Sequence, residues 1–174
     1  LAYLAPRFGL VSRDEALRAE ACQIQLTIAD LVAEAHDTHH PIAAGLYYED
    51  QKPEAKRRAR DFVEERMPKY LGWLEEILGR NQASSGRWLV GRDRTYADLS
   101  AFQVVEGLRY AFPNAMMRLE PKIPALVALR DRVAQRPRIA AYLASKQRIP
   151  FNQDGIFRRY PVLDAPAPRR SRRR

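Results

Sequence analysis

Apolar residues recur at helical spacing through most of this chain, and this pattern limits its possible folds more than any other feature. In the first such stretch, residues 12–40, the apolar stripe consists of Leu17, Ala21, Ile24, Ile28, Leu31, Val32 and Ala35. Steps of three and four place these side chains along one face of an α-helix. A similar pattern fills residues 53–78. No strand-like alternation competes with it, so the sequence predicts an all-α fold.

Capping residues and prolines predict where these helices begin and end. Ser12 is followed three residues later by Glu15, a capping box that places the start of the first helix near Ser12. Pro41 stops this helix, and Pro53 suits the first turn of the second. Pro68 interrupts the second helix without changing the phase of its apolar pattern, so we expect a kink rather than two helices.

The third predicted helix has the most specific start signal in the chain. Thr95-Tyr96-Ala97-Asp98 forms a second capping box, and apolar residues occupy almost every side of the helix that follows. Such a helix belongs at the centre of a bundle. Two shorter helices are expected at about 123–135 and 137–145. The aromatic side chains expected in the core are Phe62, Tyr70, Trp73 and Phe102.

The C-terminal end of the chain changes character twice. Residues 151–164 are irregular but rich in apolar side chains, so we expect this segment to pack back on the bundle. Residues 165–174 hold five arginines, whose removal lowers the formal net charge from +9 to +4. Like charges beside prolines and alanines predict a disordered basic tail. The rest of the chain has no basic face interleaved with aromatic residues, so we expect no specific nucleic-acid partner.

The sequence has neither a membrane signal nor a disulfide framework. No apolar run reaches the roughly 18 residues that a membrane-spanning helix needs, and no secretory segment opens the sequence. The single cysteine, Cys22, excludes an internal disulfide and a multi-cysteine zinc site. It falls beside the apolar stripe, which predicts a buried structural thiol. These features favour the cytoplasm, without membrane contact.

Several short segments carry a family resemblance. They are Tyr3-Leu4-Ala5 with Phe8-Gly9-Leu10, Ile28-Ala29-Asp30-Leu31-Val32, Arg66-Met67-Pro68-Lys69-Tyr70-Leu71, Leu89-Val90-Gly91 followed by Thr95-Tyr96-Ala97-Asp98-Leu99, and Pro124-Ala125-Leu126. Together they resemble the C-terminal domain of the cytosolic glutathione transferases, nearest to the sigma, mu and pi classes. The resemblance implies that residues 12–150 form a bundle of about five helices, and that residues 1–11 are the remnant of a thioredoxin-like domain and its linker.

The resemblance also implies that part of an enzyme is missing. The N-terminal thioredoxin-like domain of the family holds most of the glutathione site and the Tyr, Ser or Cys that activates the thiol. Leu1 to Ala5 reads as a helix end without a beginning, which fits such a gap. No residue of this chain is therefore expected to be catalytic, and the chain is expected to be inactive alone. The implied partners are glutathione as co-substrate, a hydrophobic electrophile and a second copy of the chain, with no metal.

Polar residues on the first helix form a stripe opposite its apolar face. They are Gln23, Thr27, Asp30, Glu34 and Asp37. A helix face of this kind either faces water or binds a polar ligand. Glutathione carries an ammonium group, for which a carboxylate is the natural partner. The resemblance implies that Asp30 reaches across a dimer to that ammonium.

The end of the first helix carries the sequence His36-Asp37-Thr38-His39-His40. Its His-Asp-x-x-His spacing imitates a helical zinc motif with Asp in place of Glu. Three features argue against a metal. Asp reaches less far than Glu, and Pro41 biases the backbone of His40 away from helical geometry. The sequence also offers no evident third ligand. The resemblance instead implies that Ala33, His36, Asp37 and His40 line the mouth of the electrophile pocket, with Tyr47 and Tyr48 as an aromatic wall. Surface or capping histidines remain the alternative.

Two function classes follow from the sequence. The resemblance implies a dimeric detoxifying enzyme that conjugates the glutathione thiolate to electrophiles. The alternative is a non-catalytic interaction module, because domains of this type also serve as docking surfaces in translation elongation factors and aminoacyl-tRNA synthetase assemblies. The basic tail fits the alternative, and the polar stripe fits the enzyme.

Overall fold

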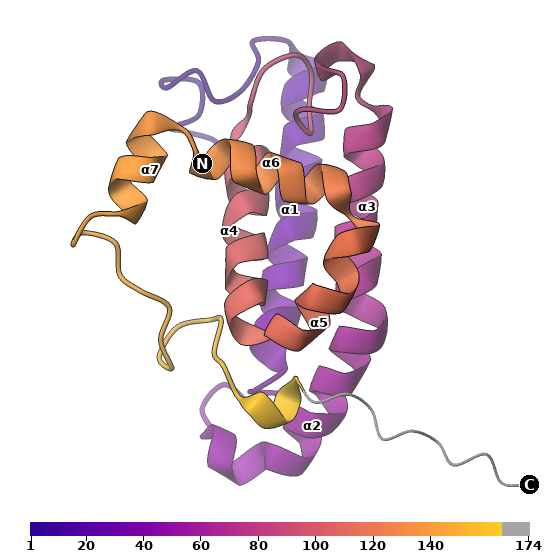
Figure 1. Cartoon of the computed structure of the whole chain (residues 1–174), viewed down its shortest axis with the longest axis vertical. Coiled ribbons are helices and arrows are strands. Elements are labelled where there is room, and N and C mark those ends of the chain that lie inside the picture. The colour runs from indigo at the N-terminus through magenta and orange to yellow at the C-terminus, as the bar shows by residue number, and fades with distance from the viewer. Residues whose placement is uncertain (165–174) are drawn as a thin grey trace, which may run out of the picture.

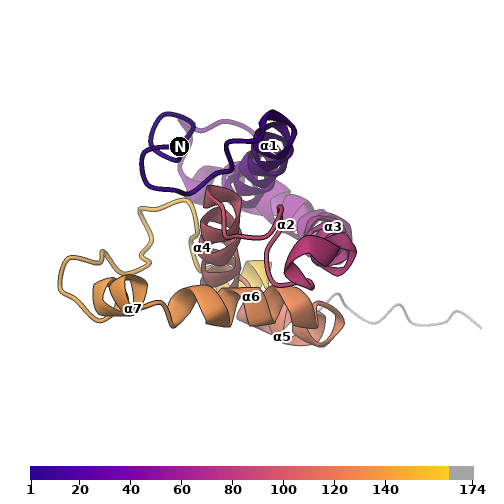
Figure 2. The same cartoon turned by 90° about the horizontal axis from the view of Figure 1, so that it is seen from above.

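Three long helices lie side by side and form the body of the molecule (Figure 1). They are α1 (Glu15–Asp37), α3 (Met67–Arg80) and α4 (Tyr96–Ala111). A further helix, α6 (Pro124–Ala134), crosses the bundle and contacts both α3 and α4, as the view from above makes plain (Figure 2). The predicted all-α helical bundle is therefore confirmed.

This computed structural model describes residues 1–164. Within that range the secondary structure is helical, with no strand. None of the helices there combines the length and apolar character needed to cross a bilayer. The predicted basic tail, residues 165–174, lies outside the described residues.

The first helix begins later than the Ser12 capping box predicts. Its N-cap is Asp14, whose carboxylate accepts a hydrogen bond from the backbone N–H of Leu17 at 3.0 Å. The Ser12 hydroxyl instead accepts from the backbone N–H of Asp14, outside the helix. Ser and Asp are comparable N-cap residues, so the sequence pattern alone favoured the wrong one of two nearby candidates.

The second predicted helix contains a wider turn just before Pro68. A short 3-10 turn, η1 (Tyr48–Gln51), leads into α2 (Lys52–Asp61), which continues through a π-helical turn, η2 (Phe62–Arg66), into α3. Proline has no backbone N–H and cannot complete the regular hydrogen-bond ladder. The N–H of Met67 donates to the carbonyl of Phe62, five residues earlier, which is the π spacing. The irregularity expected at Pro68 thus takes the form of a π turn.

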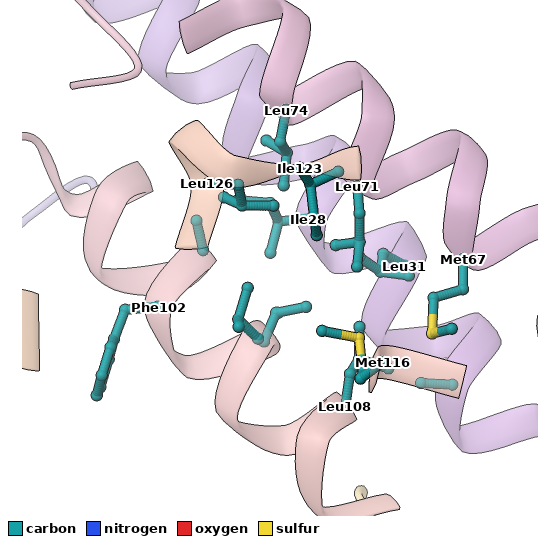
Figure 3. Close-up of a cluster of buried hydrophobic side chains, with 14 of the residues drawn as sticks. Ile28, Leu31, Met67, Leu71, Leu74, Phe102, Leu108, Met116, Ile123 and Leu126 are labelled. Atoms are coloured by element: carbon teal, nitrogen blue, oxygen red, sulfur yellow. The ribbon is translucent and has the colours of Figure 1, made fainter. Parts of the chain in front are cut away.

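The core lies between α1, α3, α4 and α6 (Figure 3). Every one of these helices contributes side chains that are at most 3% exposed, including Ile28, Leu31, Leu71, Leu74, Leu108 and Leu126. Burying a side chain of this size stabilises a fold by roughly 1.5–3 kcal/mol. The helix α4 is buried on most of its sides, as its apolar sequence predicts.

The start of α4 is fixed by a fully buried carboxylate. Asp98, which is 0% exposed, accepts hydrogen bonds from the backbone N–H of Thr95 at 2.6 Å and of Leu89 at 2.8 Å. The first bond belongs to the capping box, and the second ties the preceding loop to the helix. Asp98 therefore organises both the helix start and the chain that leads into it.

One helix of the structure was not predicted from the sequence. The helix α5 (Pro113–Leu119) follows directly after α4 and has no capping side chain in its own sequence. Its cap comes from Asp164, whose carboxylate accepts from the backbone N–H groups of Asn114 at 2.8 Å and Ala115 at 3.0 Å. Pro113 suits the first turn and is a local start signal, but the capping carboxylate lies far along the chain, so the local signal for this helix was incomplete.

The chain after α6 leaves the bundle and returns to it. The short helix α7 (Pro137–Leu143) has no fully buried residue. Residues 144–160, called the returning segment below, are irregular and run back along the bundle to η5 (Pro161–Leu163), next to α2 (Figure 1). Phe157 in this segment is 8% exposed and packs against Gly107 of α4, where a Cβ atom would overlap its ring. Gly107 thus makes room for the returning segment.

Candidate functional site

The helix α1 borders two depressions, one polar and one apolar. The polar groove has a volume of about 700 Å³ and lies between α1 and the start of α3. Its α1 wall carries Gln23, Thr27 and Asp30, three members of the predicted polar stripe. Its other wall includes Arg66, Lys69, Tyr70, Trp73 and Glu76. The groove therefore combines carboxylate, cationic and aromatic groups that could contact a zwitterionic ligand.

Asp30 offers an unpaired carboxylate in this groove. Its side chain is exposed, and among residues 1–164 it makes neither a hydrogen bond nor an ion pair. The neighbouring Thr27 is already satisfied, because its hydroxyl donates to the backbone carbonyl of Gln23 at 3.1 Å. Of the three stripe residues in the groove, Asp30 is thus the one whose charge is available to a ligand.

Glu34, one turn further along α1, is neutralised by its neighbours. Its carboxylate accepts from Arg66 Nη2 at 2.6 Å and from the Tyr70 hydroxyl at 2.8 Å, and Arg58 Nη2 lies at 3.2 Å. These contacts, led by the hydrogen bonds from Arg66, hold the pKa of Glu34 below its ordinary value. Glu34 therefore joins α1 to the α2–α3 region and does not offer a free charge.

The apolar cleft lies between α1, α4 and the returning segment. It has a volume of about 550 Å³, within the range of small-molecule pockets. Its walls include Ile28, Ala29, Val32, Val104, Phe151 and Phe157. A polar pair sits among them, since the Ser100 hydroxyl donates to Gln25 Oε1 at 2.6 Å.

The assignment of four residues at the end of α1 to the mouth of an electrophile pocket stays a prediction. None of Ala33, His36, Asp37 and His40 is among the residues that line the apolar cleft. Ala33 is exposed on α1, and Asp37 Oδ1 lies 3.5 Å from His36 Nδ1. The cleft was missed because half of its wall comes from residues 149–157, an irregular segment without a sequence pattern that fixes its position.

The predicted tyrosine wall is divided. Tyr48 is buried and stacks on Tyr160, with ring centroids 3.9 Å apart. Tyr47 is 79% exposed. The tyrosines of this loop therefore differ in role: Tyr48 anchors the returning segment, whereas Tyr47 faces solvent.

The three histidines gather at the end of α1. The ring centroids of His36, His39 and His40 are 4.8–5.0 Å apart in all three pairs. His39 is 1% exposed, and its Nε2 lies 2.9 Å from the backbone carbonyl of Ile156. Burial lowers its pKa to about 4, so its ring is neutral at neutral pH. The sequence drew attention to His36 and His40 but missed His39.

One further prediction, a buried Cys22, is wrong, and the predicted aromatic core is confirmed for two of its four side chains and in part for the other two. Cys22 is exposed and not a buried thiol, because a position one residue past Ala21 turns about 100° away from the core-facing stripe. Of the aromatic side chains predicted for the core, Phe62 and Phe102 are buried. Tyr70 and Trp73 are partly buried, pack against the core and also line the polar groove.

Comparison with known proteins identifies the family to which this helical domain belongs. Residues 36–146 match the family described as "Glutathione S-transferase, C-terminal domain". A glutathione S-transferase of Plasmodium yoelii yoelii is 28% identical over 92 residues, which are 53% of this chain and 41% of that protein. Glutathione S-transferase P of Caenorhabditis elegans is 27% identical over 138 residues, covering 76% of this chain and 61% of that protein.

A solved structure shares the fold. The Pi-class glutathione S-transferase of Onchocerca volvulus superposes with a TM-score of 0.62 at 18% identity, covering 81% of this chain and 60% of that one. The chain thus spans about two fifths to three fifths of the length of the two curated relatives named here. The family match covers well over half of the chain, including the end of α1 and all of α3, α4 and α6. The chain therefore belongs to the glutathione S-transferase family, as a C-terminal helical domain.

Proposed function

We propose that this chain is the C-terminal domain of a glutathione transferase that conjugates the glutathione thiolate to electrophilic substrates. The observation that carries the proposal is the contrast between Asp30 and Glu34. Glu34 is held by Arg66, Tyr70 and Arg58, whereas Asp30 stands one turn away with its carboxylate unpaired among residues 1–164. A carboxylate left free at the edge of a groove is suited to an incoming cation.

Asp30 would bind the ammonium group at the γ-glutamyl end of glutathione. A charge-assisted hydrogen bond of this kind is about twice as strong as a neutral one. In the sigma, mu and pi classes that the sequence resembles, the equivalent Asp serves glutathione held by the other subunit. We therefore propose a homodimer in which the exposed face of α1 meets a second copy. Leu26, which is 63% exposed and lies one turn before Asp30, supports this use of the face.

The electrophile would occupy the apolar cleft beside α4. Its aromatic and aliphatic walls suit a hydrophobic molecule, and the pair formed by Ser100 and Gln25 offers a polar contact. His39 bonds to the carbonyl of Ile156, a cleft residue, so the histidine cluster adjoins one end of the cleft. We propose that Ala33, His36, Asp37 and His40 lie beyond the Ile156 end of the cleft and form the mouth through which the electrophile enters.

The activating residue for the thiol would belong to a thioredoxin-like domain, and this chain would supply positioning. Holding the thiolate and the electrophile in contact converts a bimolecular step into an effectively unimolecular one. The described residues that line the cleft include no charged side chain, and the Ser100 hydroxyl among them already donates to Gln25. We accordingly propose a cytoplasmic detoxifying enzyme in which the thioredoxin-like domain activates the thiol and this domain positions the electrophile.

The test compares this chain alone with the same chain joined to a thioredoxin-like glutathione transferase domain. The assay is conjugation of glutathione to a chloronitrobenzene, followed by absorbance. We expect turnover from the two-domain protein and only the uncatalysed rate from the chain alone. No turnover from a folded two-domain protein that binds glutathione would favour the non-catalytic interaction module, and turnover by the chain alone would show that the chemistry has been misplaced.

A further inference from the structure

The chain contains three histidines, and the structure brings all of them together. One ring nitrogen from each of His36, His39 and His40 lies within 4.8 Å of the other two, the sole such cluster of three or more possible ligand residues found among residues 1–164. In a tetrahedral zinc site with bonds of about 2.0–2.1 Å, ligand nitrogens are roughly 3.4 Å apart. Small rotations of the partly exposed His36 and His40 side chains would close that difference.

The backbone at the end of α1 keeps the outer two histidines on one face. The N–H of His40 still donates to the carbonyl of His36 at 3.3 Å, the helical i to i−4 bond, although Pro41 follows. The rings of His36 and His40 stack with an interplanar angle of 23°. Histidines four residues apart on one helix face are the arrangement that helical zinc motifs use.

In two of the rings, one nitrogen is hydrogen-bonded to a backbone carbonyl, which leaves the other nitrogen to face a metal ion. His39 Nε2 donates to the carbonyl of Ile156 at 2.9 Å, and His40 Nδ1 donates to the carbonyl of Leu46 at 3.0 Å. A carbonyl oxygen can only accept, so in the neutral ring the lone pair lies on the opposite nitrogen. This outer contact is the one that metal-binding histidines usually make.

His39 Nδ1 is the lone-pair nitrogen that needs a partner. It is buried, and no hydrogen-bond partner exists for it among the described residues. Leaving a buried polar atom unpaired typically costs 1–3 kcal/mol, so such an atom in a native fold points to a missing ligand. A water molecule or a metal ion could supply the contact, and the neighbouring imidazoles favour the metal.

We propose that His36, His39 and His40 bind a divalent first-row transition-metal ion such as Zn²⁺. Three imidazoles leave one of four tetrahedral positions for water, and imidazole suits Zn²⁺, Cu²⁺ and Ni²⁺ but not Mg²⁺ or Ca²⁺. The ion would lock the segment around Ile156 onto the end of α1. This inference does not depend on glutathione binding.

Nearby charges act on this site in opposite directions. Asp37 Oδ1 lies 3.5 Å from His36 Nδ1 and would support a cation as an outer partner. Arg158 carries a positive charge close enough to lower the pKa of both His39 and His40, in addition to the effect of burial. Asp37 should therefore strengthen metal binding, and Arg158 should weaken it.

The experiment uses the whole chain after chelator treatment, with Cys22 changed to Ser so that its exposed thiol cannot bind metal. Zn²⁺ is titrated by calorimetry and by thermal unfolding, and Co²⁺ is followed by its visible absorption. We expect one Zn²⁺ per chain, a rise in Tm, and Co²⁺ bands of a tetrahedral site. Mg²⁺ should have no effect. Unchanged unfolding with no binding of Zn²⁺ or Co²⁺ would overturn the proposal.

Variants identify the ligands. His36→Ala and His40→Ala should each weaken Zn²⁺ binding by more than about 100-fold, since the loss of an outer partner alone costs 10–100-fold. Both residues are partly exposed, so these variants should fold. Arg158→Gln should strengthen binding severalfold, and Glu20→Gln, an exposed carboxylate on the same helix, should leave it unchanged. Binding that survives in His36→Ala and His40→Ala at full strength would show adventitious surface binding and refute the site.

Discussion

Arg66 and Glu34 form a two-point ion pair that joins the π turn to α1. Arg66 Nη2 lies 2.6 Å from Glu34 Oε1, and Arg66 Nε lies 3.0 Å from Oε2. The glutamate side chain is 16% exposed. The pair therefore fixes the wall of the polar groove, while Asp30, one turn away, has no partner among residues 1–164.

Replacing Glu34 by Gln should destabilise the fold. The amide keeps the shape of the side chain but removes the counter-charge of Arg66 and leaves Arg58 paired with Asp61 alone. Because the guanidinium groups are about one third exposed, solvent screens part of the loss, and we expect a decrease of about 1–2 kcal/mol in the free energy of unfolding. The matched control is Glu76→Gln, which removes an exposed pair with Arg80 and should cost less than about 0.5 kcal/mol. Equal losses in urea denaturation would contradict this account.

The destabilisation caused by Glu34→Gln should depend on pH. The folded-state pKa of Glu34 is below its ordinary value of 4.5, so its contribution is present above about pH 4.5 and is lost as the pH falls through the folded-state pKa. The difference in unfolding free energy between wild type and Glu34→Gln should therefore be constant near neutral pH and shrink in acid. A difference that persists unchanged down to strongly acidic pH would argue against the ion pair as its source.

Asp98→Ala should cost about 2–4 kcal/mol. The substitution leaves the backbone N–H groups of Thr95 and Leu89 without acceptors in a buried region. Asp14→Ala removes the exposed N-cap of α1 and should cost only about 1 kcal/mol. Thermal and denaturant unfolding of both variants measure this contrast. Superimposable curves for Asp98→Ala and wild type would refute the capping role.

Gly107→Ala should destabilise the chain through one side chain, Phe157. A methyl group at residue 107 would overlap the Phe157 ring, and overpacking of this kind typically costs 1–3 kcal/mol. Gly79→Ala on α3 meets no atom within 4 Å and should be neutral or slightly stabilising.

A double-mutant cycle locates the cause of that effect. In a Phe157→Leu background the cost of Gly107→Ala should shrink, because the smaller side chain removes the overlap. Strictly additive effects would mean that the returning segment does not pack as described.

The helices could be predicted from the sequence because their signals are local. The apolar stripe of α1 and the box formed by Thr95 and Asp98 each lie within a few turns of one helix. By contrast, α5 has Pro113 as its local start signal and takes its capping carboxylate from Asp164, about 50 residues later. The N-cap of α1 was misplaced for a different reason, because Ser12 and Asp14 lie two residues apart and both are favoured N-cap residues.

The candidate site was predictable only in part. The spacing of Gln23, Thr27 and Asp30 placed them on one face, and they do share the polar groove. The spacing could not reveal that Glu34 forms an ion pair with Arg66, a residue 32 positions later. Nor could it reveal the apolar cleft, whose second wall is an irregular segment held by tertiary contacts such as the bond between His39 and Ile156.

The most direct test of the proposed function is the affinity for glutathione. It is measured by titration of a two-domain protein that carries this chain, with Asp30→Ala, Asp30→Asn and the groove control Gln23→Ala alongside wild type. We predict that Asp30→Ala weakens binding roughly tenfold to a hundredfold, since the lost charge-assisted bond is worth ~1–3 kcal/mol. Asp30→Asn should fall between, and Gln23→Ala should stay close to wild type. Equal affinities for wild type and Asp30→Ala would contradict the assignment of Asp30 to the ammonium of glutathione.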